Sequence, residues 1–123
     1  NDILYGGLGN DILTGGAGSD TFVFDTALNL LTNRDNITDF NASLDTIWLS
    51  KTIFTQLNQG APLPTASLVV GPRALDANDF IIYNPLTGAL SYDADGSGAA
   101  LAVQFATFVT MTGTLTEANF YVI

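Results

Sequence analysis

A nine-residue repeat at the start of the chain restricts the possible folds more than any other feature. GGLGNDILT (residues 6–14) is followed at once by GGAGSDTFV (residues 15–23), and NDILY before them is the end of a further copy. Each complete copy has glycine at its first, second and fourth positions, aspartate at its sixth and a large apolar residue at its eighth. Self-similarity at a fixed short period predicts a solenoid in which successive repeats stack.

The residue types of the repeat specify turns and strands. Glycine allows the positive φ angles of a tight turn, and the residues around Leu13 and Phe22 form a very short strand with its apolar side chain pointing inward. A flexible glycine-rich linker is the alternative, but a linker does not hold an aspartate and a large apolar residue in strict register. The repeat therefore predicts a coil of alternating turns and strands.

Each turn of such a coil offers oxygen atoms to a cation. It presents backbone carbonyls and one carboxylate, so two stacked turns can surround Ca²⁺ with six or more oxygens at about 2.3 to 2.6 Å. Eleven of the 12 acidic residues are aspartates, which are short enough to serve as ligands from a loop. Solubility is the alternative role for this acidity.

Composition excludes several classes of function. The net charge of −9 makes nucleic acids and anionic membranes poor partners. The chain has no cysteine or histidine, and therefore no disulfide, thiol nucleophile, imidazole base or histidine-bound zinc. No apolar run approaches the length of a membrane span, and the first residues lack the features of a signal peptide. We expect a non-catalytic, monomeric chain without stable membrane insertion.

Residues 1–23 closely resemble the RTX, or hemolysin-type, calcium-binding repeat GGxGxDxUx. In the parallel β-roll of that family, a calcium ion lies between turns that are two repeats apart. The resemblance implies one site formed by Asp2, Asp20 and the carbonyls of Gly15 and Ala17. We expect this site to be incomplete, because its other half requires residues that precede Asn1.

The resemblance implies a better site at the first complete repeat, where the carbonyls of Gly7 and Gly9 join the carboxylate of Asp11. The second half of this site must come from residues after the repeats, where Phe24 replaces a glycine. The candidate ligands are three downstream aspartates: Asp25, Asp35 and Asp39. Solvated strand ends are the alternative role for Asp35 and Asp39.

After residue 24 the sequence alternates as β-structure does. Short strands are predicted at residues 37–40 and 46–49, and DFIIY and ALSYD are predicted to form a hairpin joined by NPLTG. In ALAVQFATF, the alternation places Leu101, Val103 and Phe105 on one face. Ser50 can cap a short helix at KTIFTQLNQ, and Thr116 can cap one helical turn at EAN before a last strand, NFYVI.

A second candidate metal site is the loop DADGSG (residues 93–98), where Asp93 and Asp95 begin like an EF-hand loop. The twelfth position is Gln104, although an EF-hand requires a bidentate glutamate there, and both neighbours of the loop are predicted strands. The remaining alternatives are a small calcium site and a hydrated β-turn.

The order of motifs from DTFVF to the last apolar strand resembles the region that follows the repeats in serralysin-type metalloproteases and other type I secreted proteins. The expected fold is all-β. Residues 1–23 are expected to end a parallel β-roll, and residues 24–123 to form a β-sandwich-like C-terminal cap with one or two short helices and a secretion signal.

The resemblance also implies a function. The implied function is that of a calcium-binding folding and export module at the C-terminus of a bacterial protein. Such a protein is secreted by a type I system, through an ABC transporter complex, to the exterior or the cell surface. An enzyme is expected only upstream. The alternative is a terminal adhesin or surface-layer segment that presents a ligand-binding or self-association face, and exposed aromatic side chains beside the roll would favour it.

Overall fold

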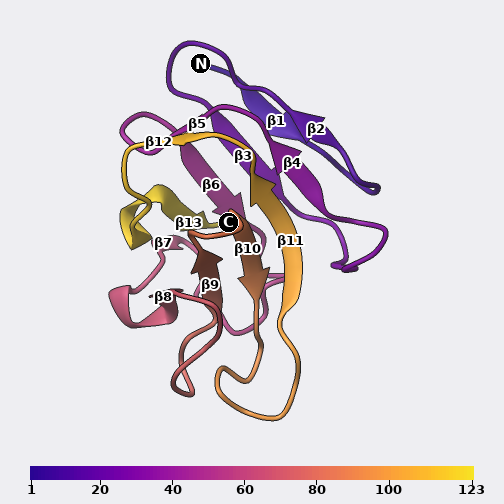
Figure 1. Cartoon of the computed structure of the whole chain (residues 1–123), viewed down its shortest axis with the longest axis vertical. Coiled ribbons are helices and arrows are strands. Elements are labelled where there is room, and N and C mark those ends of the chain that lie inside the picture. Colours follow the sequence, from indigo (N-terminus) through magenta and orange to yellow (C-terminus); the bar gives the residue numbers. More distant parts are fainter.

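The computed structural model describes residues 1–123 and shows an all-β chain, as predicted (Figure 1). The strands are β1 (Ile3–Tyr5), β2 (Ile12–Leu13), β3 (Thr21–Phe24), β4 (Asp35–Ile37), β5 (Phe40–Asn41), β6 (Thr46–Leu49), β7 (Ala61–Pro62), β8 (Leu68–Val70), β9 (Ile81–Asn84), β10 (Ala89–Tyr92), β11 (Val103–Phe108), β12 (Met111–Thr112) and β13 (Phe120–Val122). Two single-turn 3₁₀ helices, η1 (Thr65–Ser67) and η2 (Glu117–Asn119), complete the fold. No helix is long and apolar enough to cross a membrane.

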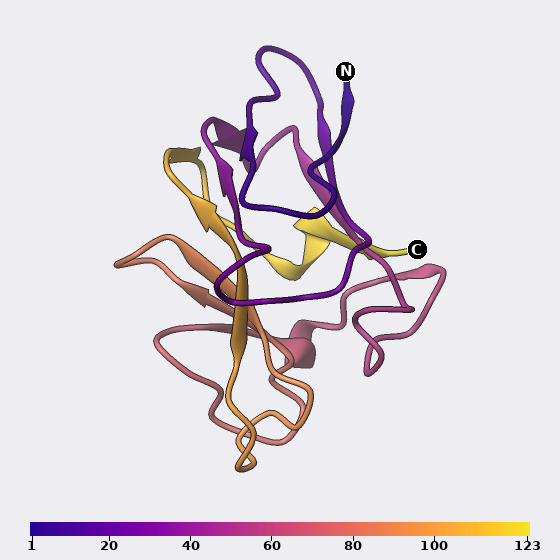
Figure 2. The same ribbon diagram turned by 90° about the vertical axis from the view of Figure 1, so that its right-hand side faces the viewer.

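Two sheets make up the body of the molecule. The first sheet has the order β1-β3-β6-β13-β7, and the second has the order β2-β4-β11-β10-β9-β8. The pairs β1–β3, β3–β6 and β6–β13 are parallel, as are β2–β4 and β4–β11. From β1 to β4 the chain alternates between the two sheets, and after β5, which pairs with β12 in a separate two-stranded sheet, it returns to the first sheet as β6. This is the path of a coil (Figures 1 and 2).

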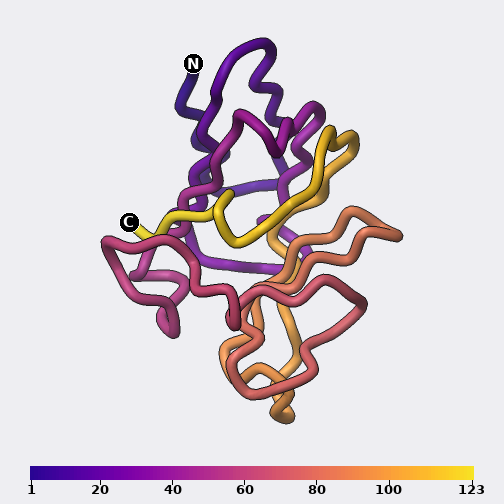
Figure 3. Tube along the Cα trace, turned by 90° about the vertical axis from the view of Figure 1, so that its left-hand side faces the viewer, coloured from indigo at the N-terminus to yellow at the C-terminus, as the bar shows by residue number.

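The coil continues beyond the last recognisable repeat. After β6 the chain leaves the coil to form β7 to β10, and then returns as β11 beside β4 and as β13 beside β6. Both parallel ladders therefore extend across residue 24, and the division into residues 1–23 and 24–123 stays a prediction. The N-terminus lies at one end of the molecule, whereas the C-terminal segment crosses its middle (Figures 1 and 3).

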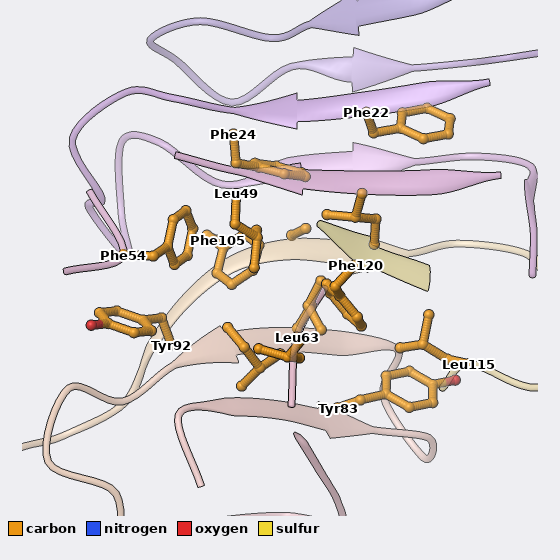
Figure 4. Packing of buried hydrophobic residues seen from close by; sticks show 14 of the residues in the cluster. Phe22, Phe24, Leu49, Phe54, Leu63, Tyr83, Tyr92, Phe105, Leu115 and Phe120 are labelled. Carbon is orange, nitrogen blue, oxygen red and sulfur yellow. The ribbon is translucent and has the colours of Figure 1, made fainter. Parts of the chain in front are cut away.

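The core lies between the two sheets (Figure 4). It contains 20 buried apolar residues, including Leu13 and Phe22 from the eighth positions of the repeats, which confirms that this position points inward. Phenylalanines connect the sheets, since the Phe24 and Phe105 ring centroids are 5.0 Å apart with the rings at 71°. Edge-to-face pairs of this kind add to the stabilisation from burial.

The predicted hairpin and the predicted last helical turn are both present. β9 and β10 are antiparallel, with Asn84 opposite Ala89 across the turn. Thr116 precedes η2 as its N-cap residue, and its backbone N–H donates to Asn119 Oδ1 at 3.0 Å. This bond satisfies a backbone donor at the start of the short helix.

Three local predictions were wrong. Residues 37–40 do not form one strand, because β4 ends at Ile37, residues 38–39 bend and β5 begins at Phe40. Residues 51–59 form turns and not a helix, because Phe54 and Leu57 are both buried in the core and the backbone folds to direct them there. Leu101 is 89% exposed and precedes β11, whereas Phe105 is buried. The alternation in this segment begins only where the segment pairs with β10, so Leu101 does not share the inward face.

Candidate metal centre

The turns of the coil form two rows, one at each edge of the roll. In the first row, residues 15–20 lie between Asn1–Asp2 and residues 40–45. In the second row, residues 6–11 lie against the loop of residues 25–35. Hydrogen bonds between successive turns define both rows.

The first row carries three aspartates in sequence, which we call the aspartate row: Asp2, Asp20 and Asp45. The backbone N–H of Asp2 donates to Asp20 Oδ1 at 2.7 Å, and that of Asp20 donates to Asp45 Oδ1 at 2.9 Å. Each carboxylate therefore reaches back to the preceding coil. Asp20 and Asp45 are only 1% and 3% exposed.

The second row pairs Asp11 with Asp35. The Asp11 backbone N–H donates to Asp35 Oδ1 at 3.0 Å, and Asp35 is buried. Burial raises the pKa of Asp35 above its usual value and the nearby charge of Asp11 raises it further, whereas the hydrogen bond from Asp11 N–H lowers it. The ionised form of Asp35 is therefore poorly stabilised by the protein alone.

The loop of residues 25–35 is fixed to the turn of residues 6–11. The Asn10 side chain donates to Leu31 O at 3.1 Å and accepts from Arg34 N–H at 2.8 Å. The Thr26 hydroxyl donates to Gly7 O at 2.9 Å. One carbonyl implied as a calcium ligand therefore receives a hydrogen bond from the loop.

Two buried carboxylate oxygens have no hydrogen-bond partner: Asp11 Oδ2 and Asp20 Oδ2. Leaving a buried carboxylate oxygen without a hydrogen-bond partner costs about 1 to 3 kcal/mol. A β-carbon on Gly6 would overlap Asp35 Oδ2 and would lie 3.3 Å from Asp11 Oδ2. The turn thus requires glycine beside its carboxylates, and the donor set of carboxylates and carbonyls suits a hard cation such as Ca²⁺.

Carboxylates alone do not make a complete metal site. No group of three or more acidic side chains lies close enough together to hold a metal ion. Backbone carbonyls would have to supply the remaining oxygens, as the repeat implies. Gly7 and Gly9 have φ angles of +78° and +118°, and this left-handed backbone shapes the turn that would present those carbonyls.

The structure places the other predicted ligands in different positions. Asp39 lies in the first row, where its carboxylate accepts from Gly15 N–H at 2.9 Å and from Gly16 N–H at 2.7 Å. Asp25 is exposed at the end of β3, and Ala17 is exposed at the tip of its turn. Among the three candidates for completing the site of Asp11, only Asp35 is hydrogen-bonded to that residue.

The loop of residues 93–98 uses its two carboxylates internally. Asp95 Oδ2 accepts from Ala100 N–H at 3.0 Å, which lowers the pKa of Asp95, while burial and the neighbouring Asp95 raise the pKa of buried Asp93. Asp93 Oδ1 accepts from Asp95 N–H at 3.3 Å. Asp93 also lines a cavity of about 280 Å³ with Arg73 and Ser97. These are the contacts of a polar turn.

Sequence reasoning did not assign Asp45 as a site residue. A signal was present in five aspartates, each of which stands two residues before a large apolar residue of a core-facing strand: Asp2, Asp11, Asp20, Asp35 and Asp45. The pattern is D-I-L and D-T-F in the repeats, and D-N-I and D-T-I after them. The glycines are lost after residue 24, but the aspartate keeps its place at the start of each strand.

Comparison with known proteins agrees with this geometry. A family model described as the RTX calcium-binding nonapeptide repeat (4 copies) matches residues 1–25. No curated protein matches the chain. RTX nonapeptide repeats bind calcium, and the match covers both turns that hold the unpartnered carboxylate oxygens. Residues 1–25 are therefore similar to the RTX calcium-binding nonapeptide repeats.

Proposed function

We propose that the chain is a non-catalytic, calcium-dependent folding and export module of a type I secreted bacterial protein. One observation carries the calcium part of this proposal: Asp11 Oδ2 and Asp20 Oδ2 are buried without partners inside RTX turns. Without a cation, these turns bring carboxylates together and remove them from water. Ca²⁺ neutralises them and links successive coils, so binding and folding form one equilibrium.

This coupling between calcium binding and folding determines on which side of the cell envelope the module folds. Free calcium is scarce inside a bacterium and plentiful outside, and a ligand that binds only the folded state stabilises it by mass action. The chain would remain loosely folded during transport and fold on emergence. Secretion to the exterior or the cell surface, by an ABC transporter complex that recognises the C-terminal residues, belongs to the same proposal.

The packing of the last strand supports recognition before folding. The side chain of Phe120 is 1% exposed, and that of Val122 is fully buried. β13 pairs with β6 on one side and with β7 on the other. A transporter could read these side chains only in the unfolded chain. Calcium-driven folding and recognition of the C-terminal segment would therefore exclude each other.

Circular dichroism and thermal unfolding in calcium, in magnesium and in chelator test the calcium part. We expect a higher melting temperature in millimolar calcium than in chelator, with a smaller effect of magnesium because Mg²⁺ requires a tighter octahedral site. The protein retains a large apolar core, so calcium should stabilise it more than nucleate it. Identical unfolding curves in the three media would reject the proposal.

Three aromatic side chains on the outer face of the first sheet, those of Tyr5, Trp48 and Tyr121, favour a second candidate function, a ligand-binding face. Tyr5, Val23, Trp48 and Tyr121 are register partners on successive parallel strands, so their side chains share one face. Tyr5 and Tyr121 are 57% and 37% exposed. Val23 lies outside the core cluster yet is only 1% exposed, because larger neighbours flank it.

Fluorescence can test this face, because Trp48 is the only tryptophan. A change in Trp48 emission on titration with neutral oligosaccharides, lost in Tyr121→Ala, would support ligand binding. A change that depends on protein concentration, with a rise in mass by light scattering, would support self-association. An emission spectrum that changes neither with oligosaccharide nor with protein concentration would reject this second candidate.

A further inference from the structure

The last turn of the first row is formed by residues 40–45. It differs from the turns before it in the groups that cover its far side, which is the side facing away from the turn of residues 15–20. Thr21 pairs with Thr46, so the turn of residues 15–20 lies on the turn of residues 40–45 with an offset of 25 residues. By this offset Ala42 takes the position of Ala17, whose carbonyl the repeat pattern implies as a calcium ligand. The far side of the last turn is covered by β12, which pairs with β5, and by the side chain of Asn119.

Asn119 uses its whole amide group in this position. Its Nδ2 donates to Ala42 O at 2.8 Å and to Asp45 O at 3.1 Å, and its Oδ1 accepts from Thr116 N–H at 3.0 Å. The residue is only 7% exposed. Both N–H groups and the oxygen of the buried amide are therefore satisfied, as buried polar groups require.

The contrast with the repeat turns is chemical. At Asp11 and Asp20, in the repeat turns of the two rows, one buried carboxylate oxygen lacks a partner. At the end of the first row the side chain is the neutral amide of Asn119, and its N–H groups donate to the carbonyls of Ala42 and Asp45. β13 begins at Phe120, which pairs with Ile47, and η2 immediately before it brings Asn119 to the last turn. The one carboxylate of η2, Glu117, accepts instead from the Thr65 hydroxyl at 3.2 Å.

We infer that Asn119 ends the row of cation sites, with its amide N–H groups taking the place of a calcium ion on the carbonyls of the last turn. A cation and an amide nitrogen can both bind two converging carbonyls, but the amide brings its own donors and requires no compensating carboxylate. The closing coil is therefore held without calcium. This inference rests on the proposed function, in which the preceding turns are calcium sites.

The isosteric variant Asn119→Asp tests the inference, with Asn119→Ala as its matched control. The aspartate removes both donors and sets a negative charge beside two carbonyls, a group of three oxygens that a hard cation can bind. In chelator, we expect either variant to lower the melting temperature by about 5 to 15 °C. In millimolar calcium, Asn119→Asp should regain most of this loss and bind one more calcium ion by native mass spectrometry.

The alanine control should show the same loss in calcium as in chelator. If Asn119→Asp does not fold in chelator, refolding from urea by calcium titration gives the same discrimination, since recovery in calcium supports the inference. Equal losses for Asn119→Asp in both media, or failure to refold in calcium, would overturn it. The unmodified chain measured in parallel separates the two proposals, because its own response to calcium tests only the proposed function.

Discussion

The carboxylate of Asp35 accepts a hydrogen bond from the backbone N–H of Asp11, 24 residues earlier in the sequence, at 3.0 Å. This bond repeats the geometry that joins Asp2 to Asp20 within the RTX segment. A residue with no glycine-rich turn before it thus completes the row that the repeats begin. The loop of residues 25–35 replaces a repeat in position, although its sequence has lost the repeat pattern.

Replacing Asp11 with asparagine should reduce the stabilisation by calcium, because the unpartnered Oδ2 is the oxygen best placed to require a cation. At a calcium concentration of 100 times Kd, one site contributes about 2.7 kcal/mol of stability, and most of that contribution should be lost. Thermal unfolding with and without calcium measures it. Asp25→Asn is the matched control, since Asp25 is exposed, and a loss in that variant equal to the loss in Asp11→Asn would show that Asp25 completes the site.

The raised pKa of Asp35 predicts how stability depends on pH in chelator. The folded state binds this proton more tightly than the unfolded state, so the contribution of Asp35 to stability is present below the unfolded value of 3.8 and is lost as pH rises through the higher folded pKa. Melting temperatures between pH 4 and pH 7 should show this loss, and Asp35→Asn should abolish it. Calcium should also reduce the dependence, because a bound cation favours the ionised carboxylate. A dependence that remains unchanged in Asp35→Asn would assign it to another group.

Gly6→Ala should impair the second row without changing any charge. The added β-carbon would overlap Asp35 Oδ2 and lie 3.0 Å from its Cγ, so the carboxylate must move. Overpacking of this kind costs about 1 to 3 kcal/mol, and calcium affinity measured by titration calorimetry should fall. Ser19→Ala, an exposed position in the neighbouring turn, should leave both quantities unchanged. Unaltered affinity in Gly6→Ala would show that Asp35 is not part of the site.

Asp45→Ala should destabilise the protein whether or not calcium is present. Its two oxygens accept from Asp20 N–H at 2.9 Å and from Asn41 N–H at 2.7 Å, and the residue is buried. Leaving buried donors unsatisfied costs about 1 to 3 kcal/mol each. Urea unfolding in chelator measures this loss, and Asp76→Ala at an exposed position serves as the control. A loss confined to calcium-containing buffer would instead make Asp45 a calcium ligand with no independent structural role.

The sequence was sufficient to predict what local chemistry determines. The repeat identified the turns at residues 6–11 and 15–20, the inward position of Leu13 and Phe22, and the all-β class, because glycine, aspartate and apolar residues each have one role in a nine-residue coil. The cap at Thr116 and the hairpin of β9 and β10 were equally local. Each of these features depends on residues that are close together in the chain.

The features that the sequence left open depend on distant pairing. Nothing near Val103 or Phe120 indicates that β11 pairs with β4 and β13 with β6 across about seventy residues, because a short buried strand has no signature of its partner. The same limit left three aspartates as alternatives for the second half of one site. The structure separates them by row, with Asp35 beside Asp11 and Asp39 beside Gly15.

The place of β11 and β13 has a consequence during synthesis. β11 lies between β4 and β10, and β13 lies between β6 and β7, yet both come from residues after 102. A nascent chain that has emerged only that far lacks an interior strand of each sheet, so its strands face gaps with unpaired edges. Neither sheet can therefore close until residues 103–122 have been synthesised, and before that point the open edges of both sheets keep the segment an incompletely paired chain.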